Sequence, residues 1–371
     1  MTSDQSRCAG ELGEETRPGA VNAHTHLYSG LAPLGMPAPS RAPADFVDIL
    51  KLVWWRLDRA LDEAALRAAA RLYIAEALLV GTTTLVDHHE SPAFIEGSLD
   101  VLAEAADELG ARLLVTYGAT ERNGGLAEAK RGLAECARFV REARFPRVKG
   151  LIGLHASFTL SDDAIRAAGE LAQDLGVPVH VHVAEAEADV LDARQRGYEG
   201  PLERLIALGC LPPRSIVAHG VWLDEASVKR ADVAGAWLVQ NPRSNANNRV
   251  GYPHALHASA RVAIGTDGFP ANMTDELRAL DEESTKNRDV AGPGALLARR
   301  AGGLTLAALF DEGVQRDTVS GVRGKPPREV FVDGRVVVKD GVLVHGDVNE
   351  IRAVAREQAA RLWSRMATLG E

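Results

Sequence analysis

Short apolar runs rich in β-branched residues alternate along the chain with longer stretches rich in Ala, Leu, Glu and Arg. The short runs are typical of buried strands and the longer stretches of helices, so the alternation predicts parallel strands joined by crossover helices. The pattern occurs eight times, with predicted strands at 19–26, 82–88, 112–118, 148–155, 177–182, 215–219, 236–240 and 261–267. Predicted helices include 63–80, 98–109, 126–142 and 162–175. Eight units favour an α/β fold of the (β/α)8 TIM-barrel type over an open dinucleotide-binding sheet, since no GxGxxG follows the first strand.

The region after the last predicted barrel strand has a different pattern. Residues 329–344 contain two Asp-Gly pairs between apolar runs, which is a strong hairpin signal, and an amphipathic helix over 348–367 follows. We therefore expect a catalytic barrel over 18–305. A reduced β-rich appendage with a C-terminal helix is expected over 306–371, packing with residues 1–17.

Composition and charge narrow the class of protein. The chain has 371 residues, of which 46% are hydrophobic, and a net charge of −9, which argues against a nucleic-acid partner. No apolar run reaches the roughly 20 residues of a membrane helix, and the polar, acidic N-terminus does not resemble a secretory signal. Cys8, Cys136 and Cys210 lie far apart, as expected for inert thiols in a reducing compartment. We expect a cytoplasmic enzyme with a small-molecule substrate and no membrane partner, and we leave a homodimer open.

The histidines are concentrated at the predicted strand ends. Eight of the 11 lie at or near the C-terminal ends of strands, where TIM-barrel enzymes carry their catalytic residues. These eight are His24, His26, His88, His89, His155, His180, His182 and His219.

Several of these residues have the chemistry of a metal site. His24 and His26 are two apart in a strand and therefore share a face, and Asp267 ends the last predicted strand. Taken singly, the HxH pair could be two hydrogen-bonded histidines and Asp267 a helix N-cap. Together with His182 they predict a site suited to zinc, and also to ferrous iron or manganese. Such a site leaves a position for water, whose pKa a catalytic metal lowers to about 7.

The motifs around these residues resemble those of the amidohydrolase superfamily, in particular its cytosine deaminase/chlorohydrolase (triazine-hydrolase) branch. The matching segments are NAHTHLYS, GTTTLVDHH, LHASFTLSD, HVHVAEAEAD, VAHGVWL, QNPRSNANN and GTDG. Within that branch, WWRLDRALDE, VDHHESP and HASFTLSD look most like the SsnA-type aminohydrolases. The resemblance covers about residues 18–299.

The resemblance implies specific roles. His24, His26, His182 and Asp267 would bind one divalent metal ion, with zinc first. Glu185 would be the acid/base, His219 would orient or polarise the attacked group, and Asp267 would also take the proton of water. His155 and Arg122 would touch the substrate. The family's β-sandwich must be reduced here, because few residues precede the first strand. Lys149 stands at the start of its strand, not at the end where a bridging carboxylated lysine is found, so we expect a mononuclear site.

We therefore predict hydrolytic deamination of an amino-substituted nitrogen heterocycle of the purine, pterin, pyrimidine or triazine type. A hydrolase of another C–N or C–Cl bond, such as a chlorohydrolase or cyclic amidase, would use the same residues and stays open. A non-catalytic barrel is disfavoured because the complete ligand and acid/base set is present.

Other polar and aromatic residues near the strand ends receive mainly structural interpretations. We expect His180 to be a hydrogen-bonded core histidine rather than a residue that supports a ligand. His88 and His89 should point in opposite directions. Trp54 and Trp55 fit a substrate lid or packing on the barrel rim equally well. The remaining polar residues are expected to form a turn or to be solvated: Asn245, Asn247, Asn248, Glu187 and Asp189.

Overall fold

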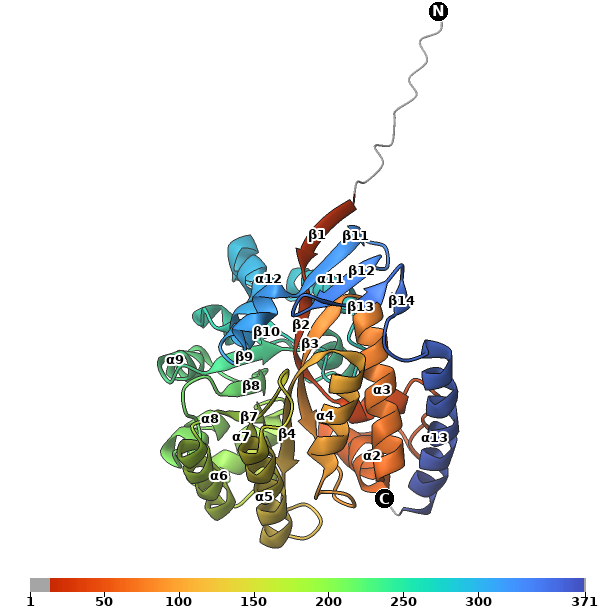
Figure 1. The fold of residues 1–371 in the computed structure, drawn as a ribbon. Helices are drawn as coiled ribbons and strands as arrows, with labels where there is room; N and C mark the ends of the chain where they lie inside the picture. The colour runs from red at the N-terminus through yellow and green to blue at the C-terminus, as the bar shows by residue number, and fades with distance from the viewer. Residues whose placement is uncertain (1–13, 370–371) are drawn as a thin grey trace, which may run out of the picture.

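The computed structural model describes residues 14–369, and its larger sheet forms the predicted barrel (Figure 1). Eight strands pair in parallel in the order β10-β9-β8-β7-β6-β4-β3-β2. The circle closes through a single parallel bridge between Thr25, at the end of β2, and Asp267. The strands are β2 (Ala20–Thr25), β3 (Thr82–His89), β4 (Arg112–Ala119), β6 (Ile152–Ala156), β7 (Val179–Val183), β8 (Ile216–His219), β9 (Trp237–Gln240) and β10 (Val262–Ile264). The (β/α)8 prediction is confirmed.

One predicted strand is interrupted. The segment predicted at 148–155 consists of β5 (Val148–Gly150) and β6, both paired with β4. Between them Leu151 still donates its backbone N–H to Val115 O at 3.0 Å, so the interruption is a bend in a continuous path. The apolar pattern runs through Leu151 without a break, and therefore the sequence did not reveal it.

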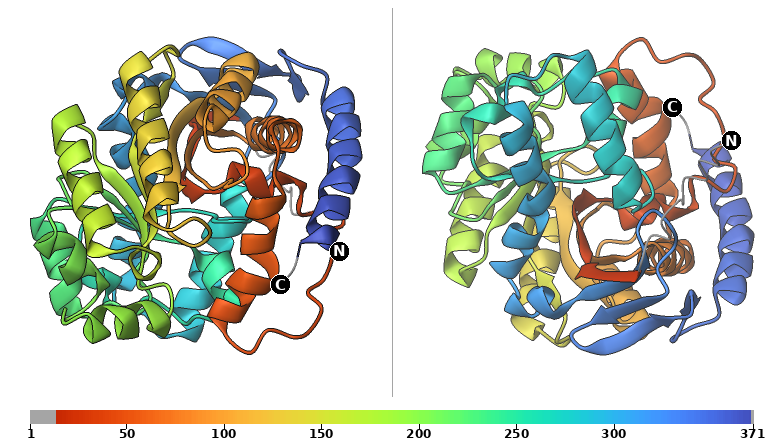
Figure 2. Two further views of the ribbon diagram at one scale, coloured as in Figure 1. Left: turned by 90° about the horizontal axis from the view of Figure 1, so that it is seen from below. Right: turned by 90° about the horizontal axis from the view of Figure 1, so that it is seen from above.

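Helices surround the barrel on its outer side (Figure 2). They include α3 (Glu63–Leu79), α4 (Ser98–Leu109), α5 (Leu126–Glu142), α6 (Asp162–Leu175), α7 (Glu187–Gln195), α8 (Pro201–Ala207), α9 (Glu225–Val233), α11 (Met273–Lys286) and α12 (Gly292–Ala308). The predicted bounds hold because local caps set them. Ser161 accepts from Ala164 N at the start of α6, and Gly176 ends that helix with a φ of 65°.

A second sheet lies at the end of the barrel where the strands begin (Figure 1). It is antiparallel, in the order β1 (Glu14–Pro18), β11 (Thr318–Val322), β12 (Glu329–Val332), β13 (Arg335–Lys339) and β14 (Val342–Leu343). Both Asp-Gly pairs form its turns, with positive φ at Asp333, Gly334, Asp340 and Gly341. In the described part of the chain the appendage is this one five-stranded sheet. The last helix, α13 (Val348–Thr368), packs along α3 on the outside of the barrel (Figures 1 and 2).

The opposite end of the barrel is covered by shorter elements. A long connection between β2 and α3 holds η1 (Leu27–Leu31), α1 (Phe46–Ile49), the π-helix η2 (Leu50–Trp54) and α2 (Trp55–Ala60). Three further short elements precede β10: η3 (Ser157–Thr159), α10 (Pro242–Asn248) and η4 (His254–Ala258). A fourth, η5 (Glu312–Arg316), contacts β12 of the second sheet instead. Within residues 14–369, no helix combines the length and apolar character needed to cross a membrane.

Candidate active site

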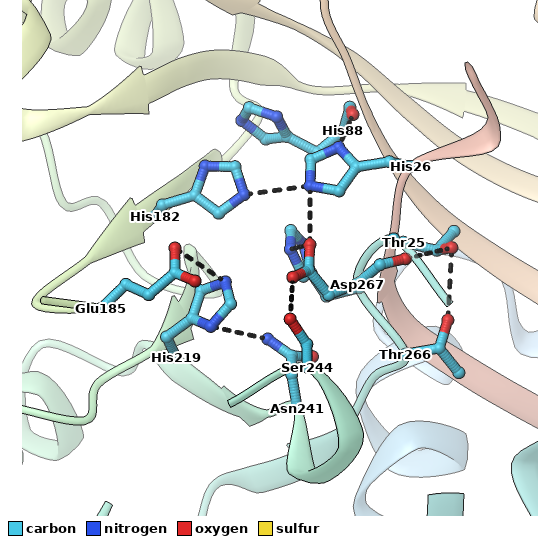
Figure 3. A network of polar contacts seen from close by, with 12 residues as sticks. Thr25, His26, His88, His182, Glu185, His219, Asn241, Ser244, Thr266 and Asp267 are labelled. Carbon is cyan, nitrogen blue, oxygen red and sulfur yellow. Dashed lines mark hydrogen bonds and ion pairs between the residues drawn. The ribbon is translucent and has the colours of Figure 1, made fainter. Parts of the chain in front are cut away.

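Four side chains from three separate strand ends converge in the mouth of the barrel (Figure 3). His26 Nε2 lies 2.9 Å from Asp267 Oδ1, and His24 Nε2 lies 3.6 Å from the same oxygen. His182 Nε2 lies 3.3 Å from His26 Nε2. The structure thus brings together His24, His26, His182 and Asp267, the four ligands expected from the sequence; we call these four residues the metal cluster.

Hydrogen bonds behind the histidines leave their inner nitrogens free for a cation. His26 Nδ1 donates to the carbonyl of His88 at 2.5 Å, and His182 Nδ1 donates to the carbonyl of His155 at 2.7 Å. A carbonyl only accepts, so in the neutral rings the proton stays on Nδ1 and each Nε2 presents a lone pair. His24 Nε2 is buried without a hydrogen-bond partner. His24, His182, His219 and Asp267 offer ligand atoms within 4.8 Å of one another, and His26 with His88 and His182 forms an overlapping group, so the donors gathered here fit a divalent metal ion.

The electrostatics of the cluster also favour a positive charge. Burial opposes protonation of His26, but the hydrogen bond and negative charge of Asp267 outweigh it and raise the pKa of His26 to about 9. Burial dominates at His24 and lowers its pKa to about 3. Although burial works against its charged form, Asp267 keeps a pKa well below its ordinary value because the imidazoles of His24 and His26 lie next to its carboxylate.

Left-handed backbone turns direct the reactive side chains inward. Ala184, His219 and Asp267 have φ values of 52°, 73° and 53°. For residues with a Cβ atom this conformation costs of order 1 kcal/mol or more, and it is common at functional sites. Ala184 directly follows β7, His219 is the last residue of β8, and Asp267 lies three positions after the end of β10, so each turn diverts the chain from the sheet at a strand end.

Glu185 and His219 lie side by side next to the metal cluster (Figure 3). Glu185 Oε2 is 3.5 Å from His219 Nε2. Burial, followed by the negative charge of Asp267, raises the pKa of Glu185 well above its ordinary value, so this carboxyl holds a proton more firmly than a solvated one. Glu185 is therefore suited to act as a proton donor.

Asp189 holds the turn that carries Glu185, and this corrects the expectation that Asp189 is solvated. Its carboxylate accepts from Ala184 N at 2.7 Å and from Phe158 N at 3.1 Å, and the side chain is buried. Helix α7 points this residue back toward the barrel. Glu187, two positions earlier, is exposed as expected.

A pocket of about 630 Å³, measured out to its mouth, opens beside the metal cluster. Its walls are mostly aromatic or apolar, which suits a planar ring. The apolar and aromatic lining consists of Phe46, Leu50, Trp54, Trp55 and Phe158, and the polar lining outside the metal cluster includes Tyr28, Glu90, His155, Glu185, Asp189 and Asn248. Trp54 and Trp55 thus face the site.

The two expected substrate contacts occupy different places. His155 lines the pocket, and its Nδ1 lies 3.0 Å from Thr159 Oγ1. Arg122 is buried behind Trp55: it donates to Asp58 Oδ2 at 2.8 Å, and its guanidinium carbon lies 4.8 Å from the centre of the Trp55 ring. Arg122 lines a second, neighbouring pocket and does not line the pocket beside the metal cluster, where a substrate contact was expected.

Three buried residues take part in the site in ways the sequence analysis did not assign. His180 Nε2 lies 2.9 Å from His24 Nδ1, so His180 supports a predicted ligand. His88 points inward, with Nδ1 2.9 Å from Glu90 Oε1 and Nε2 donating to Leu154 O, whereas His89 contacts Ser91 Oγ. Glu90 faces the pocket, and its place directly after two histidines at a strand end could have indicated a site residue. Lys149 is exposed in β5 and outside the metal cluster.

Comparisons with known proteins agree with this geometry. Residues 17–311 match the model of the amidohydrolase family. A 5'-deoxyadenosine deaminase of Methanopyrus kandleri is 29% identical over 95% of this chain and 88% of its own length. An 8-oxoguanine deaminase of Pseudomonas aeruginosa is 30% identical over 70% of this chain and 61% of its own. The crystal structure of an adenosine deaminase from Xanthomonas campestris with bound zinc is similar with a TM-score of 0.80, at 23% identity, over 95% of this chain and 86% of that one.

Proposed function

The chain belongs to the amidohydrolase family, and we propose that it is a metal-dependent deaminase that hydrolyses the C–N bond of an amino-substituted nitrogen heterocycle. The observation that carries this proposal is the place of Glu185, with its raised pKa, beside His219 and the metal cluster on the wall of an aromatic pocket. The deaminase class predicted from the sequence is confirmed by the relatives, which are named as deaminases of adenosine derivatives and of 8-oxoguanine.

We further propose that the metal cluster holds one zinc ion per chain, with ferrous iron and manganese as alternatives that fit the same donors. Zinc bound there supplies a Lewis acid and makes water a competent nucleophile at neutral pH. The unpartnered Nε2 atom of His24, the Nε2 atoms of His26 and His182 that face each other at 3.3 Å, and the ionised Asp267 support this assignment.

The chain's own residues then move the protons of the reaction. Asp267 accepts a proton from the attacking water, and Glu185 donates its proton to the ring nitrogen next to the carbon under attack. His219, beside Glu185, contacts and orients the group at that carbon. The ring carbon becomes tetrahedral, the amino group takes up the proton that Asp267 accepted and leaves as ammonia, and the oxygen of water remains on the ring as a carbonyl when its second proton returns to Glu185.

The pocket walls orient the substrate. Trp54, Trp55 and Phe158 offer flat apolar surfaces to a planar ring, and His155 and Glu90 offer polar contacts at its edge. Because the named relatives act on purine compounds, we place a purine first among the heterocycles. A small-molecule substrate and a cytoplasmic location complete the proposal.

An ammonia-release screen with zinc-loaded protein tests it. The panel contains 5'-deoxyadenosine, 8-oxoguanine, guanine, a pterin, cytosine, and amino- and chlorotriazines, and we expect ammonia from at least one purine. Metal-free protein is the control and should be inactive. Chloride from a chlorotriazine with no ammonia from any compound would replace the proposal with C–Cl hydrolysis.

A further inference from the structure

The short helix α10 contacts two reactive residues that belong to different strands. It follows β9, which supplies none of the residues discussed so far, and it contains Asn245, Asn247 and Asn248, which were expected to form a turn. Ser244, Asn245 and Asn248 are its buried polar residues, whereas Ala246 and Asn247 face solvent. The polar face of α10 is therefore turned into the protein.

Ser244 holds one oxygen of Asp267 (Figure 3). Its hydroxyl donates a short hydrogen bond to Asp267 Oδ2, and its oxygen accepts from Asn248 Nδ2 at 3.3 Å. An ionised carboxylate only accepts hydrogen bonds, so the direction of the hydroxyl proton is fixed. With Oδ2 held in this way, Oδ1 is the oxygen that faces His26 Nε2 at 2.9 Å.

Asn245 holds the ring of His219. Its Oδ1 lies 2.9 Å from His219 Nδ1, and this contact is shorter than the 3.4 Å between Asn241 Nδ2 and the same nitrogen. An amide oxygen only accepts, so Nδ1 carries the proton and Nε2 is the nitrogen that faces Glu185.

We propose that Ser244 and Asn245 are positioning residues for the deamination reaction, through which α10 sets the orientation of the Asp267 carboxylate and the tautomer of His219. Ser244 and Asn245 are adjacent in one helix, whereas His219 ends β8 and Asp267 follows β10. Helix α10 therefore fixes His219 and Asp267 relative to each other. The catalytic consequence rests on the proposed function; the placement of the proton on His219 does not.

Steady-state kinetics of Ser244→Ala and Ser244→Thr, with the substrate identified by the ammonia screen, tests the first half. In the Ala variant we expect kcat to fall by about tenfold to 100-fold, the usual effect of losing a residue that orients a site, with KM changed by less than about threefold and zinc content unchanged. The Thr variant keeps the hydroxyl and should recover most of kcat. Ala246→Gly weakens the same helix without removing a side-chain contact and should leave kcat near that of the parent.

Imidazole ¹⁵N NMR of zinc-loaded, substrate-free protein tests the second half, with the His219 signals assigned by their loss in His219→Gln. The parent and Asn245→Asp should carry the His219 proton on Nδ1, and Asn245→Leu should move it to Nε2. The proposal is overturned if His219 of the parent protein carries its proton on Nε2, or if Ser244→Ala has an unchanged kcat. It is also overturned if Ser244→Ala loses zinc and kcat together and Ser244→Thr does not restore them. If the parent releases no ammonia from any compound, the proposed function fails, and the NMR result still decides the role of Asn245.

Discussion

Replacement of Glu185 by Gln should lower activity and raise stability, and the second effect follows from the burial of the carboxyl. Burial and the charge of Asp267 raise the pKa of Glu185 well above its ordinary value of 4.5. Between the unfolded and the folded pKa, the folded protein holds a proton that the unfolded chain releases. Taking up this proton costs about 1.4 kcal/mol for each pH unit above the unfolded pKa, so that about 3.4 kcal/mol is the upper bound at pH 7. Gln needs no proton, so the metal-free variant should have a free energy of unfolding higher by up to this amount.

The sign of the pH dependence follows from the same linkage. A carboxyl with a raised pKa in the folded state gains stability as the pH falls, because only the folded state is protonated between the two pKa values. The difference between Gln variant and parent should be large at pH 7 and should close as the pH falls toward 4.5, where the unfolded chain is protonated too. Urea unfolding at pH 5, 6 and 7 in the presence of a chelator measures it.

With zinc bound, Glu185→Gln should keep its metal and lose kcat by at least ~10²-fold, about 2.7 kcal/mol of transition-state stabilisation. Glu187→Gln is the matched control, since Glu187 lies on the same segment but is exposed. Normal turnover by Glu185→Gln, or equal unfolding free energies of variant and parent across pH 5–7, would refute the reasoning.

Three further substitutions test the metal cluster, the pocket wall and the barrel packing. His26→Ala should lose most of the bound zinc, measured by mass spectrometry of the metal, whereas the exposed His345→Ala should keep it; retention in both would contradict the assigned ligands. Arg122→Met leaves Asp58 buried and unpaired, so it should lower the free energy of unfolding by about 3 kcal/mol, and it should raise KM because Trp55 loses the guanidinium packed on its ring. Adding Asp58→Asn should recover part of the stability. An unchanged unfolding free energy in the single variant would argue against the Arg122–Asp58 ion pair. Gly302→Ala places a Cβ atom 2.0 Å from the carbonyl oxygen of Val262 and should lower the unfolding free energy by about 1–3 kcal/mol. Gly294→Ala in the same helix meets open space and is the control. Equal melting temperatures of the two variants would contradict the close packing of α12 on β10.

The barrel could be predicted because its strands and helices are encoded locally. The caps at Ser161 and Gly176, for example, set the bounds of α6 within a few residues of sequence. The pattern of strand ends likewise suffices to place His24, His26, His182 and Asp267 at one end of the barrel.

The roles of the supporting residues could not be predicted, since they depend on contacts between distant segments. His180 and His24 are 156 positions apart, and nothing in either motif specifies that their rings meet. Arg122 pairs with Asp58 instead of lying on the pocket, because the connection after β2 folds back over the barrel mouth. Asn245 was expected to be a turn residue and Ser244 received no role for the same reason: the helix that carries them faces inward only once β8, β9 and β10 lie next to one another.

The closure between β2 and β10 ties assembly of the barrel to assembly of the site. Among the residues that the structure describes, Thr25 and Asp267 form its only β-bridge, and Thr25 Oγ1 also donates to Asp267 O across 242 positions of the chain. Contacts between such distant segments form late in folding, because the entropy of closing a long loop must be offset by the structure already made. His24 and His26 lie on one side of this closure and Asp267 lies on the other. A chain that has folded every other unit but left this junction open therefore has no complete ligand set, so competence for metal binding reports closure of the barrel.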